Sequence, residues 1–168
     1  MESVEPIRSE KKIQDLKKYL LGAGSMRNYA LVVVGINTAL RVSDLLNLTW
    51  QDIYDFEEKE FKSHVYIKEK KTGKPKKFLL NKNAVEALRK LKKEFGQPLP
   101  LQPIFVSRNG FNKPITRFRA NEIIKNSCAA VGIKEHIGCH SLRKTFGYHS
   151  WKKGVPIQIL MELYNHSN

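Results

Sequence analysis

The stretch Thr38-Ala-Leu-Arg-Val-Ser-Asp44 joins an apolar segment to the start of a short helix and holds Arg41 at the junction. Apolar residues on both sides place the stem of this arginine in a partly buried position. An arginine in such a place most often forms a structural ion pair, here with Asp44. The other interpretation is that its planar, permanently charged guanidinium binds an anion through two parallel hydrogen bonds. The stretch alone leaves both interpretations open.

Around this stretch the pattern indicates a mostly helical domain that is interrupted by a small sheet. Apolar residues recur at helical spacing through most of the chain, with polar residues that suit N-caps in front of them. Helix starts are expected at Ser25, after Ser43, at Asn81, at Thr116, near Ser141 and near Pro156. From about residue 53 to residue 80 the pattern changes to strands, and Lys71-Thr-Gly-Lys74 forms a turn between two of them. The predicted fold class is α+β, mainly helical with a small antiparallel sheet or hairpin.

Length and charge bound the function. A chain of 168 residues is most simply a single domain over residues 1–168. Thirty lysines and arginines against 16 acidic residues give a net charge of +14, which favours a polyanionic partner such as nucleic acid. The start, Met-Glu-Ser-Val-Glu-Pro, lacks the features of a signal peptide, and Cys128 and Cys139 suit reduced thiols. A cytoplasmic location and no membrane span are therefore expected.

A second basic motif, His140-Ser-Leu-Arg143, stands at an expected helix start and is followed by Lys144-Thr-Phe. The i, i+3 spacing puts the imidazole and the guanidinium on one helix face, near a helix N-terminus that favours anions. The competing interpretation is a metal site formed by His136, Cys139, His140 and His149. Their spacing matches no standard zinc pattern, so neither a metal nor another cofactor is predicted.

Lysines crowd the expected hairpin. Lys71 stands at its tip, and a lysine among other cations loses its proton more easily, which suits a general acid. A solvated or phosphate-contacting charge run explains most of its neighbours, although Lys70 and Lys74 remain alternatives for the acid. The residues for which only a DNA-binding role is expected are Lys70, Lys74, Lys76, Lys77, Arg117 and Lys144.

Taken together, these motifs resemble the catalytic domain of the tyrosine recombinases, the phage integrase family. The Arg-Val-Ser-Asp-Leu-Leu-Asn-Leu string from Arg41, the Lys-Thr-Gly turn at Lys71, the His-Ser-Leu-Arg-Lys-Thr-Phe run and a final Tyr-Asn-His-Ser occur in the family's order. The catalytic set that the resemblance implies is Arg41, Lys71, His140, Arg143 and His166, with Asp44 in a supporting role.

In the reaction that the resemblance implies, two arginines clamp a DNA phosphate while a tyrosine attacks it and forms a 3′-phosphotyrosyl intermediate. Lys71 would protonate the leaving oxygen, His140 would donate to the phosphate or act as a base, and His166 would bind a non-bridging oxygen. The bond energy is stored covalently, so no ATP or metal is needed. The family's tyrosine is expected beyond Asn168, and its helical core-binding domain is expected to be absent from this chain. The chain as given is therefore expected to bind DNA without cutting it.

The resemblance also implies double-stranded DNA as the partner, self-association on that DNA, and a bacterial or phage-type protein of the nucleoid. Three alternatives stay beside site-specific recombination and integration. A type IB topoisomerase uses similar chemical groups, and a DNA-binding regulator of the same fold would keep the phosphate pocket without cutting. A basic RNA-binding module is disfavoured, because no aromatic-rich strand of the kind that stacks on RNA bases is present.

Overall fold

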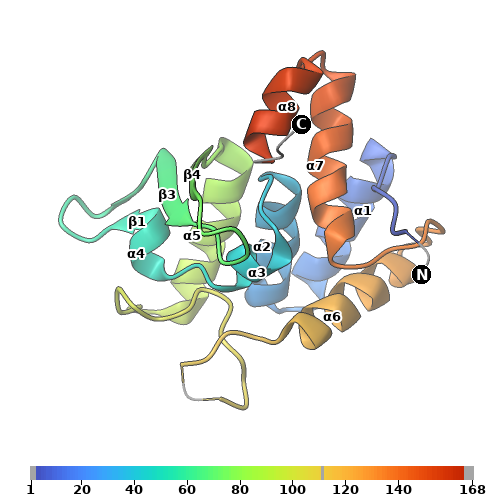
Figure 1. Ribbon diagram of the computed structural model, residues 1–168. Helices are drawn as coiled ribbons and strands as arrows, with labels where there is room; N and C mark the ends of the chain where they lie inside the picture. Colours follow the sequence, from blue (N-terminus) through green and yellow to red (C-terminus); the bar gives the residue numbers. More distant parts are fainter. Residues whose placement is uncertain (1–2, 111, 165–168) are drawn as a thin grey trace.

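A computed structural model describes residues 3–110 and 112–164 of the chain. This described part contains eight helices and four short strands. Figure 1 shows their arrangement. The helices are α1 (Glu10–Gly22), α2 (Met26–Ile36), α3 (Val42–Leu46), α4 (Trp50–Ile53), α5 (Lys82–Phe95), α6 (Arg117–Ala130), α7 (His140–Lys152) and α8 (Ile157–Leu163). The strands are β1 (Tyr54–Asp55), β2 (Glu60–Phe61), β3 (His64–Lys68) and β4 (Pro75–Leu79). The predicted α+β class, mainly helical, is confirmed.

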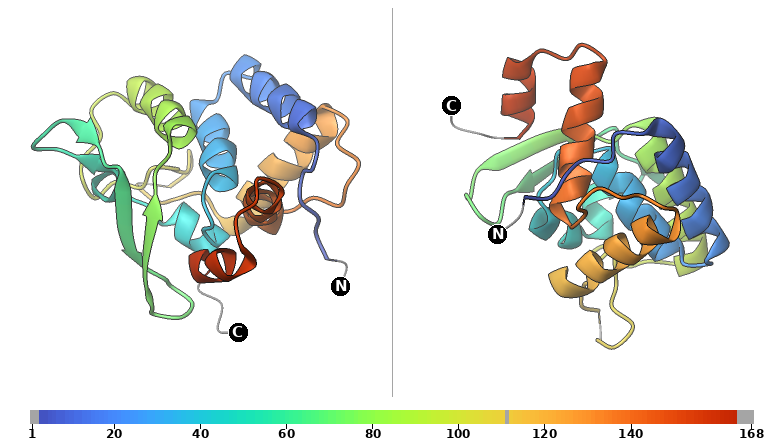
Figure 2. Two further views of the ribbon diagram at one scale, coloured as in Figure 1. Left: turned by 90° about the horizontal axis from the view of Figure 1, so that it is seen from above. Right: turned by 90° about the vertical axis from the view of Figure 1, so that its right-hand side faces the viewer.

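Helix α2 forms the centre of the core. Its residues from Tyr29 to Gly35 are all buried, and a helix that is apolar on every side must be surrounded by other elements. Helices α1, α5 and α7 pack around it, as Figures 1 and 2 show. The chain then leaves α2 through the buried Ala39 and Leu40 and reaches Arg41 at the start of α3. The core helix therefore fixes the position of this arginine.

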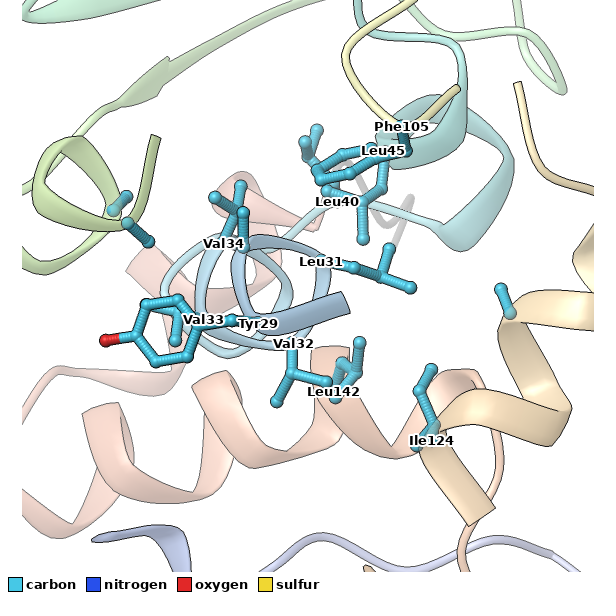
Figure 3. Packing of buried hydrophobic residues seen from close by; sticks show 14 of the residues in the cluster. Tyr29, Leu31, Val32, Val33, Val34, Leu40, Leu45, Phe105, Ile124 and Leu142 are labelled. Atoms are coloured by element: carbon cyan, nitrogen blue, oxygen red, sulfur yellow. The ribbon is translucent and has the colours of Figure 1, made fainter. Parts of the chain in front are cut away.

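A close approach between α2 and α7 brings the second basic motif to the same side. A Cβ added at Gly35 would meet Cδ1 of Leu142 at 2.5 Å, so only glycine permits this spacing. Leu142 is 2% exposed and points at α2 beside Val32 (Figure 3). Its neighbours His140 and Arg143 lie in the first turn of α7. The N-terminal end of α7 is thereby held beside the segment that leads into α3.

The strands form two separate antiparallel pairs rather than one sheet. Strand β1 pairs with β2, and β3 pairs with β4 in a register that places Val65 opposite Phe78 and Ile67 opposite Lys76. Residues 69–74 connect β3 to β4, and the hydrogen bond from the Glu69 N–H to the Lys74 carbonyl, 2.8 Å long, closes this connection. We refer to residues 69–74 as the hairpin turn.

Several helix boundaries follow from local chemistry, as predicted. The side chains of Ser25, Asn81 and Thr116 accept hydrogen bonds from backbone N–H groups in the first turns of α2, α5 and α6. Gly96 ends α5 with a φ of 96°, which favours glycine. The short helix α4 was not expected from the sequence. Its start is stabilised by the Asp52 carboxylate, which accepts a hydrogen bond from the Thr49 N–H at 2.8 Å.

Candidate active site

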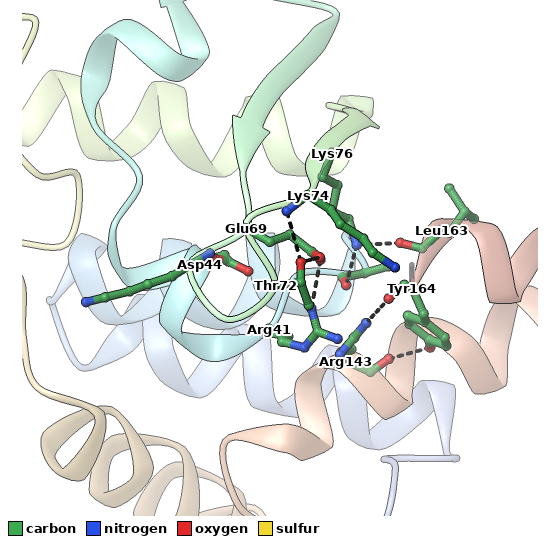
Figure 4. A network of polar contacts seen from close by, with 11 residues as sticks. Arg41, Asp44, Glu69, Thr72, Lys74, Lys76, Arg143, Leu163 and Tyr164 are labelled. Carbon is green, nitrogen blue, oxygen red and sulfur yellow. Dashed lines mark hydrogen bonds and ion pairs between the residues drawn. The ribbon is translucent and has the colours of Figure 1, made fainter. Parts of the chain in front are cut away.

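Arg41 is held by an acid that the sequence analysis did not single out. It is the N-cap residue of α3, and its Nη1 lies 2.8 Å from Oε2 of Glu69, the first residue of the hairpin turn. The Glu69 side chain is fully buried and that of Arg41 is 16% exposed. The other Glu69 oxygen accepts a hydrogen bond from the Thr72 hydroxyl at 2.7 Å. The buried carboxylate therefore fixes both the arginine and the turn (Figure 4).

The expected ion pair between Arg41 and Asp44 is not formed. Asp44 is 5% exposed, and its Oδ1 accepts a hydrogen bond from the backbone N–H of Lys70 at 2.9 Å. Its Oδ2 is buried and has no hydrogen-bond partner within the described residues. Asp44 thus attaches the hairpin turn to α3, which is the position from which a supporting residue can act.

Arg143 projects from α7 into the same region and is held by the end of α8. Its Nη2 donates to the backbone carbonyl of Tyr164 at 2.8 Å, and the Tyr164 ring lies 4.5 Å from the guanidinium carbon. The Tyr164 hydroxyl in turn donates to the Arg143 carbonyl at 2.9 Å. Burial lowers the pKa of Arg143, and the charge of Arg41 lowers it further. Figure 4 shows the two guanidinium groups facing the same region.

Lys76 does not belong to the solvated lysines of the hairpin, and this part of the sequence interpretation was wrong. It is 5% exposed, and its ammonium donates to the Ala39 carbonyl at 3.0 Å and to the Leu163 carbonyl. Burial lowers its pKa to about 8, with the charge of Arg143 as the next cause. The strand explains its position, because Lys76 and Phe78 are both buried on one face of β4. Lys77 points the other way and lies over the Tyr66 ring at 5.6 Å.

The other lysines of the region stay at the surface. Lys70, Lys71 and Lys74 are exposed in the hairpin turn, where Gly73 adopts a φ of 71°. Lys71 is close enough to His140 for its charge to lower the pKa of that histidine. Lys144 is exposed and donates to the Val4 carbonyl at 2.8 Å, so it lies against the N-terminal segment.

His140 is the first residue of α7, and its Nε2 lies 2.8 Å from Nη2 of Arg117 on α6. Its pKa is lowered, first by partial burial and then by the charges of Arg117, Arg143, Lys144 and Lys71. His166 lies outside the described residues. Within the described ranges no group of three His, Cys, Asp or Glu residues is arranged to hold a metal ion. No helix in those ranges has the length and apolar character to cross a membrane.

Four of the five predicted catalytic residues thus come from three separate segments and lie close enough for their charges to interact. Arg41 precedes α3, Lys71 lies in the hairpin turn, and His140 and Arg143 lie on α7. Glu69 was not predicted as a site residue, although it is the one acid within the run from Lys68 to Lys77. An isolated acid in such a basic run is a signal that it pairs with a cation elsewhere.

The chain belongs to the phage integrase family, whose family model matches residues 8–168. The chain is 38% identical over 168 residues to "Probable integrase/recombinase YoeC" of Bacillus subtilis (strain 168), and the match covers all of this chain and 86% of that protein. It is 28% identical over 156 residues to "Tyrosine recombinase XerA" of Pyrococcus horikoshii, covering 92% of this chain and 51% of that protein.

Among solved structures, the crystal structure of XerA recombinase superposes with a TM-score of 0.77 at 22% identity, covering 99% of this chain and 58% of that one. These values show a shared fold. The chain spans most of the Bacillus relative but only about half of the XerA sequence. The resemblance to the tyrosine recombinases that the motifs indicated is confirmed at the level of family and fold.

Proposed function

We propose that this chain supplies the phosphate-activating part of a site-specific recombinase, which cuts and rejoins duplex DNA through a phosphotyrosyl intermediate. The observation that carries the proposal is the convergence of Arg41 and Arg143 from two different elements. Two guanidinium groups repel each other, and after burial the charge of Arg41 is the next cause of the lowered pKa of Arg143. An anion bound between them removes that repulsion, and a phosphodiester with two non-bridging oxygens matches two arginine forks.

Each step of the proposed reaction has a group that can perform it. A tyrosine oxygen attacks the phosphorus, its proton passes to a base, and the bond from phosphorus to the 5′ oxygen breaks. Arg41 and Arg143 stabilise the negative charge that builds on the non-bridging oxygens. Lys71 gives its proton to the departing 5′ oxygen, since it lies in the exposed hairpin turn and its charge acts on His140. Rejoining is the same sequence in reverse, with a DNA hydroxyl as the attacking group.

Lys76 is a poor candidate for the acid despite its lowered pKa. Its ammonium is enclosed between the carbonyls of Ala39 and Leu163, so it faces the protein rather than the surface. Lys71, in contrast, is exposed and can reach a ligand that docks on the turn. We therefore propose Lys71 as the acid and Lys76 as a residue that ties β4 to the carbonyls of Ala39 and Leu163.

The charge of the chain and a further structural neighbour support duplex DNA as the partner. The net charge of +14 suits a partner with a dense row of phosphates. The XerH recombinase in a pre-cleavage complex bound to difH substrate has a TM-score of 0.74 to this chain at 16% identity, covering 99% of this chain and 49% of that one. We propose that the surface formed by Arg41, the hairpin turn and the start of α7 contacts DNA, and that copies of the protein assemble on it.

The decisive experiment is covalent trapping on a nicked suicide duplex that carries the cognate site, recovered beforehand by selection of bound fragments. It compares the 168-residue chain with the same chain extended through the downstream codons of its gene. We expect both to bind duplex DNA with strong salt dependence, and only the extended protein to give a protein–DNA band that survives denaturation. In the extended protein, Arg41→Lys and Arg143→Lys should each reduce trapping by about a hundredfold, because a lysine lacks the fork.

Arg89→Lys is the matched control, because Arg89 is a surface arginine on α5 whose side chain is 61% exposed. It should trap DNA as the unchanged protein does. A band already formed by the 168-residue chain would mean that one of its own tyrosines is the nucleophile. Binding of the cognate site by the extended protein without any band would instead favour the non-cutting regulator.

A further inference from the structure

The contact between Arg117 and His140 constrains the protonation state of the histidine. A guanidinium carries only N–H donors and keeps its charge in proteins. With 2.8 Å between Nη2 of Arg117 and Nε2 of His140, the imidazole nitrogen must be the acceptor. A histidine that accepts at Nε2 is neutral and carries its proton on Nδ1.

The scaffold around this contact is built from hydrogen bonds between the two helix starts. The Cys139 N–H donates to Oδ1 of Asn121 on α6 at 3.0 Å, and the Cys139 thiol lies 3.6 Å from the Arg117 carbonyl. A Cβ at Gly138 would meet that same Asn121 oxygen at 3.1 Å, so the approach is close. The start of α6 is therefore bonded to the residue before His140, and these bonds position the Arg117 side chain next to the imidazole.

Every charged group that lowers the pKa of His140 is a cation. Arg117 belongs to α6, Arg143 and Lys144 to α7, and Lys71 to the hairpin turn. His140 is also the first residue of α7, where the helix dipole disfavours a positive charge. These surroundings and the Arg117 contact both disfavour an imidazolium.

We propose that Arg117 is a positioning residue for His140, which holds the imidazole neutral with its proton on Nδ1 and its acceptor at Nε2. The sequence interpretation gave Arg117 a role in DNA contact alone and left two roles open for His140. The catalytic consequence rests on the proposed function: when a phosphate enters, its anionic oxygens bind the guanidinium more strongly than a neutral nitrogen does. Nε2 is then released as a base, and it takes the proton of the attacking tyrosine while Lys71 protonates the leaving oxygen.

Nitrogen-15 NMR of the histidine side chains in the 168-residue chain tests the first part, with His140 assigned by its loss in His140→Gln. In the unchanged protein we expect His140 in the Nδ1–H form, with a pKa below 6.5, the ordinary value for histidine. Arg117→Gln should raise that pKa and move the proton toward Nε2, and Arg117→Lys should give an intermediate pKa. Arg119→Gln is the matched control, since Arg119 lies on the same turn, pairs with Glu122 at 3.5 Å and is not among the charges that act on His140.

An unchanged His140 signal in Arg117→Gln, or an equal change in Arg119→Gln, would overturn the proposal. The second part uses the extended chain of the trapping experiment. There Arg117→Gln should move the acidic limb of the cleavage rate to higher pH, because the base then holds its proton to a higher pH. An unmoved limb would separate Arg117 from the reaction. If no cleavage is found at all, the proposed function fails while the NMR result on His140 still stands.

Discussion

The two arginines of the site are held in opposite ways. Arg41 is paired with the fully buried carboxylate of Glu69, whereas Arg143 donates to a neutral backbone carbonyl at Tyr164. The first arrangement joins the start of α3 to the hairpin turn through a largely buried ion pair, and its opposite charges compensate each other. The second depends on where the end of α8 lies, and α8 contacts the rest of the described structure chiefly through α7. We infer that Arg41 is a fixed part of the site, whereas Arg143 is adjusted by α8.

The largest effect should come from removing the charge that holds Arg41. Glu69→Ala leaves a largely buried guanidinium without its partner, which destabilises proteins by about 3 kcal/mol or more. Glu69→Gln should cost less, because an amide can still accept from the Thr72 hydroxyl. Urea unfolding followed by circular dichroism measures both. Glu86→Ala is the control, since the Glu86 side chain is 57% exposed in its ion pairs. This variant should lose less than about 1 kcal/mol of its free energy of unfolding.

If Glu69→Ala loses no more stability than Glu86→Ala, the pair is not a fixed element and the contrast between the two arginines disappears. A second readout sharpens the result. Glu69→Gln should weaken duplex binding through Arg41 while the hydrogen bond from Arg143 to the Tyr164 carbonyl persists, because Glu69 bonds to Arg41 and Thr72 whereas Arg143 donates to that carbonyl.

A smaller effect is expected where Tyr164 meets α7. A Cβ at Gly147 would lie 2.0 Å from the Tyr164 hydroxyl oxygen and 3.1 Å from Cζ, so Gly147→Ala must displace the ring from Arg143. We expect it to cost about 1–2 kcal/mol, as overpacking commonly does. In a Tyr164→Phe background the closest clash is gone, and alanine favours the helix over glycine by up to about 1 kcal/mol. Gly147→Ala should then be neutral or stabilising.

A thermodynamic cycle of the two single variants and the double variant checks this. Equal losses from Gly147→Ala in both backgrounds would show that Tyr164 does not sit against α7, and Arg143 would then lack its hold from α8. Gly22→Ala is a useful control, because nothing lies within 4 Å of a Cβ at that position. Its effect should be the same with Tyr164 or with Phe at position 164.

Local chemistry decided which parts of this structure could be predicted. The caps at Ser25, Asn81 and Thr116 act within one turn of helix, so the sequence around each is enough to find it. The partner of Arg41 could not be found in this way. Glu69 lies 28 residues after Arg41, beyond α3, α4, the β1–β2 pair and β3, and it reaches Arg41 only because the hairpin turn folds back onto α3. Asp44 is nearer in sequence, but it bonds to the turn instead.

Lys76 shows a different reason for error. The hairpin was interpreted by its charge, and charge does not distinguish Lys76 from Lys77. The period-two alternation of a strand does, since Phe78 is buried two residues after Lys76. For the site, the motifs indicated which residues gather, and the structure brings together Arg41, Lys71, His140 and Arg143. The prediction for His166 remains a prediction.

A pH-dependent effect is expected at Lys76, which connects the two sides of the comparison. Its ammonium donates to the carbonyl of Ala39, close to Arg41, and to that of Leu163, next to Tyr164. The pKa of Lys76 is about 8 in the folded protein, whereas the ordinary value for lysine is 10.5. Between these two pH values the unfolded chain therefore binds more protons than the folded protein. The free energy of unfolding that Lys76 contributes should therefore rise between pH 8 and pH 10.5, and it should be lost again as the pH falls through 8.

Lys76→Met removes this titration and Lys77→Met, at the outer face, does not. Urea unfolding across that window should show the difference between unchanged protein and Lys76→Met growing with pH, while the difference from Lys77→Met stays flat. A constant difference for Lys76→Met would mean that the two carbonyls hold a fully charged ammonium at every pH tested. The bridge between the fixed and the adjustable arginine would then be an ordinary charged lysine, and protonation of Lys76 would have no influence on how firmly α8 is attached.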